Sequence, residues 1–265
     1  MVQWLAKIDQ WVLFHPARWP RRELISRCAA LSIVAAFLFG KVIQFDDFPQ
    51  RFDIARRFYS AVRSSAGGPL YGPVAIKWLW GLKLSVWLLE ALIYVGYIAA
   101  YLSRSRAVAV AEGFMETAFP LFVAGLPVVM AMSPYNLPQW LPFASQSHLA
   151  FYSLVMALIL IGGLINLFGL LTLRRAFTIM TEARTLITGG LFRYVRHPLY
   201  TGHFIMFLGA LLLRLHSYTL AMYGLFAAGQ VLRAKIEERK LSAAFPQYQE
   251  YRQKTGMFFP KWNSS

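Results

Sequence analysis

Long apolar runs alternate with short polar stretches along this chain. Runs close to or above the roughly 20 residues that cross a bilayer as a helix lie at 28–45, 79–102, 114–132 and 149–173. Two shorter apolar runs follow, "GHFIMFLGALLL" and "YTLAMYGLFAAGQVL", and only "RLHS" separates them. The pattern predicts an all-α fold, a polytopic membrane bundle of about five to six membrane helices that ends in a C-terminal helical hairpin.

Composition agrees with a membrane protein. Hydrophobic residues make up 57% of the 265 residues and charged residues only 15%, whereas a soluble domain carries about 25% charged residues. The formal net charge is +15, which also raises the possibility of nucleic-acid binding. The basic residues flank apolar runs and do not form one polar face, so we expect the lipid bilayer as partner and no nucleic acid.

Basic residues also orient the predicted helices, because Lys and Arg concentrate in cytoplasmic loops. The N-terminus, the loop at 174–196 and the C-terminal tail are rich in Lys and Arg, whereas the loop at 133–148 has neither. We therefore expect a multi-pass protein whose N-terminus, 174–196 loop and tail are cytoplasmic. The segment 46–77 breaks this rule, and its "RFDIARRFYSAVR" is typical of an amphipathic helix on the headgroups.

Polar residues inside the apolar runs include Lys83, Glu90, Glu116 and Asn166. Such residues are costly in a membrane and are often functional. Packing is the interpretation that we favour for them, through a snorkelling lysine, a Glu–Lys pair between helices and an amide hydrogen bond. A transport path is the alternative that they leave open.

The stretch "GGLFRYVRHPLYTGHF" crowds cations and rings against the start of an apolar run. Pro198 favours the first helical turn, and it pushes His197 toward an extended backbone. The sequence therefore predicts a helix that begins at Pro198 with His197 and Tyr200 at its N-terminus. Unpaired N–H groups there suit a carboxylate or phosphate. A positive-inside loop with interfacial aromatic residues is the alternative.

The second polar cluster is "RAKIEE", in which Arg233 and Glu237 are four residues apart and share a helix face. A hairpin folds the far end of its second arm back to the start of its first arm. We therefore expect Arg233 and Glu237 beside His197 and Tyr200. The alternative is a surface ion pair of little energetic value.

These residues carry a resemblance. The stretch 162–260, through "RTLITGGLFRYVRHPLYTG", "RAKIEE" and "FPQYQEYRQKTGMFFP", resembles the isoprenylcysteine carboxyl methyltransferase family of integral membrane enzymes and its bacterial relatives. The resemblance implies S-adenosylmethionine as cofactor, bound without a Rossmann fold between the last helices and the tail. It implies the following cofactor-binding residues: Arg184, Thr185, Leu186, Ile187, Phe192, His197, Pro198, Leu199, Tyr200 and Glu237.

The resemblance further implies that Arg233 meets the methyl acceptor and is the catalytic residue. Two positions depart from the family pattern, since Arg184 stands where some members have His and Phe192 where many have Tyr. An upstream polar contact is expected near Glu182 or Met180. The chemistry is compatible with this cofactor, because His197 at a helix N-terminus suits its carboxylate and Glu237 suits its amino group or a ribose hydroxyl.

We therefore expect two parts, N-terminal membrane helices at 1–160 that choose the acceptor and a methyltransferase-like core at 161–265. The predicted function is S-adenosylmethionine-dependent methylation of a hydrophobic or lipid-linked acceptor at a carboxylate, amine or thiol. A sterol-reductase-like, NADPH-dependent oxidoreductase and a non-enzymatic transporter or scaffold are the alternatives. We expect no metal, because the histidines lack the spacing of metal ligands.

Overall fold

The computed structural model describes residues 28, 31–32, 34–35, 73–131 and 146–261. The predicted run at 28–45, the amphipathic segment at 46–77 and the loop at 133–148 lie wholly or mostly outside the described residues. The helices are α4 (Pro73–Ser103), α5 (Gly113–Glu116), α6 (Ala118–Ala131), α7 (Gln146–Leu173), α8 (Pro198–Leu213), α9 (Ser217–Ala244) and α10 (Tyr248–Lys254), with 3₁₀ turns η2 (Arg174–Ala176) and η3 (Gly190–Arg193).

The all-α prediction is confirmed for these residues, which contain no β-strand. Two stretches, Gly81–Ser103 and Ala150–Ala176, are long and apolar enough to cross a membrane, and Ala118–Pro127 and Pro198–Leu213 are shorter apolar helices. At about 1.5 Å per residue, the 16 residues of α8 span less than the roughly 30 Å hydrocarbon core. The number of membrane helices therefore stays a prediction.

Glycines bring α7 and α8 into backbone contact. A Cβ added at Gly162 would lie 2.5 Å from the backbone nitrogen of Met206, and one at Gly202 would lie 2.6 Å from the carbonyl oxygen of Gly162. Farther along, a Cβ at Gly209 would meet the carbonyl oxygen of Val155 at 3.1 Å. Small residues permit such close packing where the lipid supplies no hydrophobic drive between helices. As numbers rise along α7 they fall along α8, so the two helices are antiparallel.

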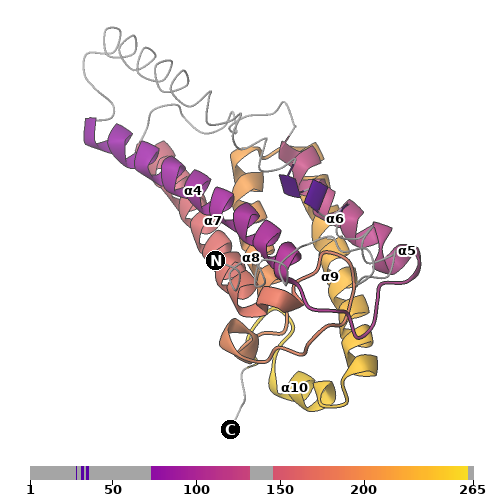
Figure 1. The fold of residues 1–265 in the computed structure, drawn as a ribbon. Helices are drawn as coiled ribbons and strands as arrows, with labels where there is room; N and C mark the ends of the chain where they lie inside the picture. Colours follow the sequence, from indigo (N-terminus) through magenta and orange to yellow (C-terminus); the bar gives the residue numbers. More distant parts are fainter. Residues whose placement is uncertain (1–27, 29–30, 33, 36–72, 132–145, 262–265) are drawn as a thin grey trace, which may run out of the picture.

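The other helix pairs fix the direction of the bundle. Asn166 of α7 meets Tyr97 of α4 and Ser153 of α7 meets Trp78, so α4 and α7 run parallel. Figure 1 shows these two helices side by side. The α8–α9 hairpin is confirmed, because α9 turns back after three residues and its Tyr223 hydroxyl donates to the Phe204 carbonyl at 3.0 Å.

The outer faces of the two candidate spans are apolar. α4 exposes large apolar side chains at positions three or four residues apart, which form one stripe along the helix, and α7 exposes a similar stripe at spacings of three, four and seven residues. On α4 the stripe consists of Leu84, Leu88, Leu92 and Val95; on α7 it consists of Leu154, Ile161, Leu164, Phe168 and Leu171. Contiguous exposed apolar stripes of this kind indicate contact with a membrane or another apolar partner.

The predicted run at 114–132 is broken at Thr117, between α5 and α6. Pro120 has no N–H to donate to the carbonyl of Glu116, and that carbonyl accepts instead from the Thr181 N–H at 2.9 Å. The Glu116 carboxylate accepts from the backbone N–H of Glu112 at 2.8 Å and pairs with Lys240 of α9. The packing interpretation of Glu116 is thereby confirmed.

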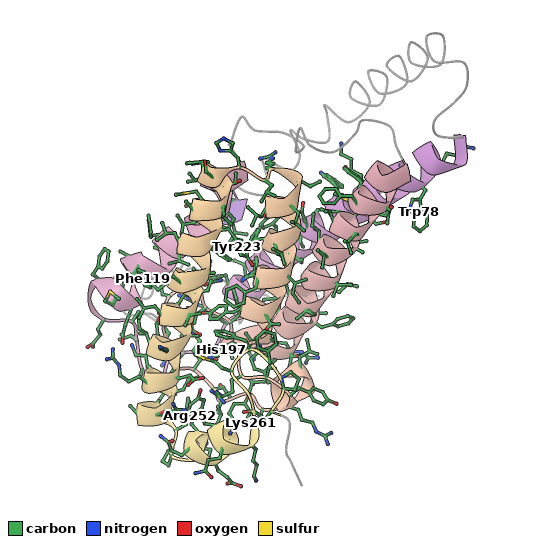
Figure 2. The ribbon with its side chains drawn as sticks, turned by 180° about the vertical axis from the view of Figure 1, so that it is seen from behind. Trp78, Phe119, His197, Tyr223, Arg252 and Lys261 are labelled. Atoms are coloured by element: carbon green, nitrogen blue, oxygen red, sulfur yellow. The ribbon has the colours of Figure 1, made fainter. Side chains whose placement is uncertain are left out.

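The loops that follow α4 and α7 lie at one end of the bundle. The backbone N–H of Ser105 donates to the Arg175 carbonyl at 2.9 Å, and Arg104 lies 3.6 Å from Glu182. Seen from behind, Figure 2 places His197, Arg252 and Lys261 at the same end, far from Trp78. The predicted cytoplasmic loop and the described part of the tail therefore share one end of the molecule, which is where the polar residues gather.

Candidate functional site

The helix α8 begins at Pro198, as predicted. Pro198 occupies the first turn, and His197 precedes it as N-cap with φ −127° and ψ 61°, outside the helical region. The preceding turn depends on Gly190, whose φ of +58° is unfavourable for other residues. A Cβ there would also lie 2.9 Å from the Thr172 hydroxyl. This turn delivers His197 and Tyr200 to the polar end of the bundle.

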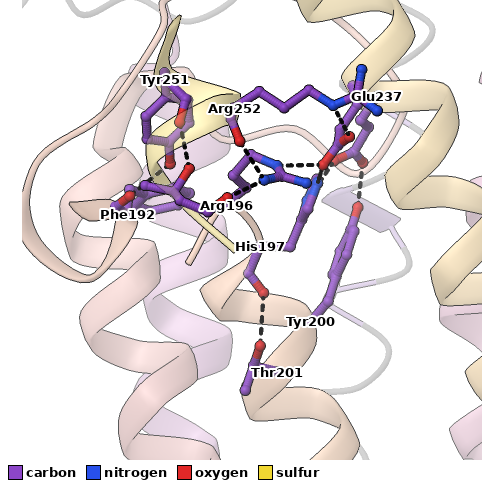
Figure 3. Close-up of polar contacts among 10 residues, drawn as sticks. Phe192, Arg196, His197, Tyr200, Thr201, Glu237, Tyr251 and Arg252 are labelled. Carbon is purple, nitrogen blue, oxygen red and sulfur yellow. Dashed lines mark hydrogen bonds and ion pairs between the residues drawn. The ribbon is translucent and has the colours of Figure 1, made fainter. Parts of the chain in front are cut away.

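The hairpin brings Arg233 and Glu237 against these two residues, as Figure 3 shows for Glu237. The Tyr200 hydroxyl donates to Glu237 Oε1, and His197 Nδ1 lies 3.8 Å from Glu237 Oε2. The rings of His197 and Tyr200 stack, with centroids 5.3 Å apart and an interplanar angle of 2°. The predicted juxtaposition of His197, Tyr200, Arg233 and Glu237 is confirmed as geometry.

Arg233 is buried and held from three directions. Its Nε lies 3.5 Å from Glu237 Oε1, one terminal nitrogen donates to the Ile179 carbonyl, and its Cζ lies 5.1 Å from the centre of the Tyr200 ring. The ion pair expected as the alternative therefore exists. It is a buried pair at the polar mouth, and the Nη1 nitrogen of Arg233 makes no hydrogen bond within the described residues.

The neighbouring Glu238 is a site residue that the sequence analysis missed. Its Oε1 accepts from Arg196 Nε at 2.6 Å and lies 3.3 Å from His197 Nε2. Arg252 Nε lies 3.5 Å from its other oxygen. Burial raises the pKa of the Glu238 carboxyl, but the hydrogen bonds from His197 and Arg196 outweigh it and lower this pKa to about 2.

This contact also orients the imidazole of His197. A carboxylate only accepts hydrogen bonds, so the network assigns a proton to His197 Nε2, which faces Glu238. The other ring nitrogen, Nδ1, then faces Glu237. Two adjacent glutamates on α9 thus contact opposite edges of one ring, and only Glu237 was anticipated.

The C-terminal tail closes this end of the bundle. The backbone N–H groups of Arg196 and His197 donate to the carbonyls of Gly256 at 2.8 Å and Met257 at 3.1 Å. The Arg196 guanidinium also donates to the Thr255 carbonyl, and the Tyr251 hydroxyl donates to the Phe192 carbonyl at 2.7 Å. Figure 3 shows Tyr251 turned toward Phe192 and Arg196 turned toward the carboxylates. The tail therefore contacts the chain at Phe192 and again at Arg196 and His197, directly before α8.

The segment 184–187 is less uniform than the resemblance implies. Arg184 is buried and donates to Glu182 at 2.6 Å, while Thr185 is exposed and Leu186 is half-buried. Ile187 packs against the core cluster that contains Phe192, Leu199 and Tyr200. The segment thus lies beside the His197 turn, with the Arg184 side chain directed into a buried ion cluster. Pro198, next to His197, is also buried.

Lys240 of α9 forms hydrogen bonds with the chain that precedes the 184–187 segment. Lys240 Nζ donates to the Thr181 carbonyl at 3.2 Å and to the Val110 carbonyl at 2.6 Å, in addition to its pair with Glu116. One lysine therefore joins three separate pieces of chain next to the site. Across the described parts of the chain, no three His, Cys, Asp or Glu side chains are grouped to hold a metal ion.

Comparison with known proteins supports the same region. Residues 154–243 match the family model described as the isoprenylcysteine carboxyl methyltransferase (ICMT) family. The matched stretch includes α8 and almost all of α9, and so contains His197, Tyr200, Arg233 and Glu237. The predicted resemblance is confirmed for this C-terminal part of the chain. No curated protein matches the chain.

Proposed function

We propose that the chain is an integral membrane methyltransferase that uses S-adenosylmethionine and methylates a hydrophobic or lipid-linked acceptor at a carboxylate, amine or thiol. The match to the isoprenylcysteine carboxyl methyltransferase family supports the class of membrane methyltransferase. The observation that carries the cofactor is the carboxylate of Glu237, which His197, Tyr200 and Arg233 surround. The match favours neither the NADPH-dependent oxidoreductase nor the transporter.

The residues present fit this cofactor. Glu237 keeps 22% of its side chain exposed, and its Oε2 has no nearer partner here than His197 Nδ1 at 3.8 Å. A carboxylate oxygen with open hydrogen-bonding capacity suits the ammonium group or the ribose hydroxyls of S-adenosylmethionine. The stacked rings of His197 and Tyr200 offer an aromatic face for the adenine or the sulfonium cation.

Each remaining residue has a distinct task in this proposal. The α8 N-terminus, with His197, attracts the cofactor's carboxylate through its unpaired N–H groups. Glu238 and Arg196 hold the imidazole and the tail in place. We assign the rest of the cofactor contact to the chain beside this turn: Arg184, Thr185, Leu186, Ile187, Phe192, Pro198 and Leu199, with Arg184 acting through the fold of its segment.

Arg233 is the residue that we assign to the acceptor. Nη2 donates to the Ile179 carbonyl, Nε lies 3.5 Å from Glu237 Oε1 without a hydrogen bond, and Nη1 is available to a carboxylate or another electron-rich group. When bound, the cofactor supplies an electrophilic methyl group on a sulfonium. Arg233 would hold and orient the acceptor at this end of the bundle, and the tail would exclude water from it. Positioning of this kind supplies much of a transfer rate without a general base when the nucleophile is already anionic.

The placement in the membrane is part of the proposal. We assign the polar end of the bundle to the cytoplasmic side, because Lys and Arg of the 174–196 loop and of the tail gather there. The acceptor then reaches Arg233 from the bilayer while the cofactor arrives from the aqueous side. Residues 1–160 are assigned to acceptor choice and 161–265 to the methyltransferase core.

Isothermal titration calorimetry of the full chain in detergent tests the function. We expect S-adenosylmethionine to bind and reduced nicotinamide dinucleotides not to bind. His197→Ala and Glu237→Ala should each weaken S-adenosylmethionine affinity by about 10- to 100-fold, the value of a charge-assisted hydrogen bond. Glu250→Ala, which removes an exposed carboxylate paired only with Lys254, is the matched control. Binding of NADPH in place of S-adenosylmethionine would identify the oxidoreductase instead.

A further inference from the structure

One helical turn deeper than Arg233, four helices contribute one uncharged polar side chain each. This polar quartet consists of Tyr97 (α4), Asn166 (α7), His203 (α8) and Gln230 (α9). The Tyr97 hydroxyl donates to Asn166 Oδ1 at 2.8 Å and lies 3.2 Å from His203 Nε2. The other ring nitrogen, Nδ1, lies 3.3 Å from Gln230 Nε2. The four side chains form one continuous chain of hydrogen bonds.

Hydrogen-bond donors and acceptors assign a direction to this chain. Tyr97 donates its only proton to Asn166, so its oxygen accepts from His203 Nε2–H. His203 Nδ1 is then an acceptor and takes a proton from the Gln230 amide. A neutral His203 satisfies every link. The two ends are left over: the Nδ2 amide nitrogen of Asn166 and the Oε1 oxygen of Gln230 have no partner among the described residues.

These two ends are deeply buried. Asn166 is 0% exposed and Gln230 is 1% exposed. A buried polar atom without a partner is unfavourable, and apolar residues of similar size would avoid the cost. Asn166 is also fixed in place, because the backbones of α7 and α8 touch beside it at Gly202. A donor and an acceptor kept unpaired inside membrane helices indicate a ligand that supplies the missing partners.

The surroundings of the quartet define the chemistry of that ligand. The Tyr97 ring stacks on Phe177 at 4.9 Å, and the His203 ring stacks on Phe207 at 5.8 Å. Tyr97 and His203 themselves are only partly buried, so two of the four side chains of the quartet keep some exposure. Its own groups are uncharged and its flanks aromatic, which suits an uncharged polar group on an otherwise apolar molecule.

The quartet adjoins the candidate site directly. His203 follows Tyr200 by three residues on α8, and their ring centroids are 6.4 Å apart. Gln230 precedes Arg233 by three residues on α9. Three residues of helix rise about 4.5 Å, so a molecule that reaches Arg233 from the bilayer passes this level.

We infer that the quartet binds an uncharged hydrogen-bonding group of the methyl acceptor, an amide, ester or hydroxyl that lies roughly one helical turn from the atom that is methylated. The inference rests on the proposed function and specifies its acceptor. The group donates to Gln230 Oε1 or accepts from Asn166 Nδ2, and an amide carries both the donor and the acceptor. The rings of Tyr97 and His203 turn aside to admit it.

The test uses the full chain in detergent, a total lipid extract of the cells that make the protein as the source of acceptor, and S-adenosylmethionine tritiated in its methyl group. Label that enters the organic phase is counted as a function of the amount of extract. Gln230→Met removes the unpaired acceptor, and Asn166→Leu removes the unpaired donor. Tyr223→Phe is the matched control, since it removes one hydrogen bond between the same two helices, α8 and α9, outside the quartet.

We expect Gln230→Met to raise the half-saturating amount of extract about five- to tenfold, the effect of one lost hydrogen bond. The maximal rate and the affinity for S-adenosylmethionine should stay within about twofold of the parent values, since Arg233, Glu237 and His197 are unchanged. Asn166→Leu should act in the same direction, and Gln230→Met supplies the answer where Asn166→Leu does not fold. Tyr223→Phe should behave like the parent.

The following results overturn the inference. If Gln230→Met leaves the half-saturating amount of extract unchanged, the quartet serves packing only. The same conclusion follows if Tyr223→Phe shifts this amount as much as Gln230→Met does. A labelled product whose mass spectrum shows no amide, ester or hydroxyl near the methylated atom excludes the ligand class. A parent protein that binds S-adenosylmethionine but labels nothing leaves the cofactor site standing and refutes the acceptor. A parent protein that does not bind it removes the proposed function and this inference together.

Discussion

Two polar layers lie one turn apart in the same helical bundle, and they differ in charge and in how completely their polar atoms are paired. In the outer layer, His197, Arg233, Glu237 and Glu238 are ionisable groups, and each basic side chain lies within 4 Å of a glutamate oxygen. In the inner layer, the polar quartet is uncharged and leaves two buried atoms unpaired. Paired ions are tolerated close to water, whereas in an apolar interior neutral polar groups are less unfavourable than ions.

The difference bears on what each layer binds. Compensated charges around an accessible carboxylate suit a zwitterionic, water-soluble cofactor. Uncompensated neutral groups between aromatic rings suit the polar part of a lipid-soluble molecule. The variants below are chosen to change one layer while leaving the other intact.

Arg233→Lys should have the largest effect. Lysine keeps the charge but loses the planar fork that contacts Glu237 and Ile179 and that we propose to contact the acceptor. Loss of one charge-assisted contact in the transition state should lower turnover by about 2–3 kcal/mol, or roughly 30- to 150-fold. Affinity for S-adenosylmethionine should barely change, as calorimetry would show. Equal losses of affinity and turnover would assign Arg233 to the cofactor instead.

Gly162→Ala should destabilise the bundle without a direct effect on either layer. The new Cβ would meet the Met206 backbone nitrogen at 2.5 Å, and α7 and α8 must separate to admit it. Overpacking of this kind costs about 1–3 kcal/mol. Thermal unfolding in detergent measures it. Gly224→Ala on α9, where a Cβ meets nothing within 4 Å, should be neutral or slightly stabilising, and equal destabilisation by both changes would contradict the account of this contact.

Glu238→Gln removes one charge from the ion cluster, and its effect on stability should be largest at neutral pH and should fade in acid. The pKa of Glu238 falls from an ordinary 4.5 to about 2 in the folded protein. A carboxyl with a lowered folded pKa stabilises the fold above pH 4.5 and loses this contribution as the pH falls toward 2. The parent's unfolding temperature should therefore drop across this window.

The decline should be shallower in Glu238→Gln, because the amide does not titrate. Glu112→Gln, which changes an exposed side chain, should keep the parent's slope. If the slopes of the parent and of Glu238→Gln coincide, the ion cluster of Arg196, His197 and Glu238 does not stabilise the fold in the way described.

Sequence periodicity predicted the parts of this structure that are local. Apolar runs predicted α4, α7 and the hairpin, and Pro198 fixed the start of α8. The i,i+4 spacing placed Arg233 and Glu237 on one face, and the hairpin brought them to His197. Hydrophobic pattern and proline geometry depend only on residues close in the sequence, so they can be interpreted before the fold is known.

The contacts that sequence analysis missed are non-local. Glu238 differs from Glu237 only by a rotation of about 100° on the helix, and its partners come from the loop before α8 and from α10. The course of the tail along Arg196 and His197 follows no periodicity. Asn166 was interpreted as a packing residue, and its hydrogen bond to Tyr97 confirms that much. Its unpaired amide became visible only when four helices were assembled.

Glu116 combines a local feature that the sequence predicts with a non-local contact that it does not. Its pairing with a lysine was one of the interpretations made from the sequence, but the partner, Lys240, lies 124 residues away. The break at Thr117 depends on Thr181, which takes the carbonyl that Pro120 cannot use. A proline inside an apolar run signals a possible break, and the tertiary contact decides whether the break occurs.

The measurement that tests the two-layer account most directly is a crossed titration of Glu237→Gln and Gln230→Met. For each variant, affinity for S-adenosylmethionine is measured by calorimetry, and half-saturation by lipid extract is measured by tritium transfer. The account predicts that Glu237→Gln weakens the cofactor about tenfold or more and leaves extract half-saturation near the parent value. It predicts the reverse for Gln230→Met. Equal shifts of both quantities in both variants would contradict the separation of cofactor and acceptor between the two layers.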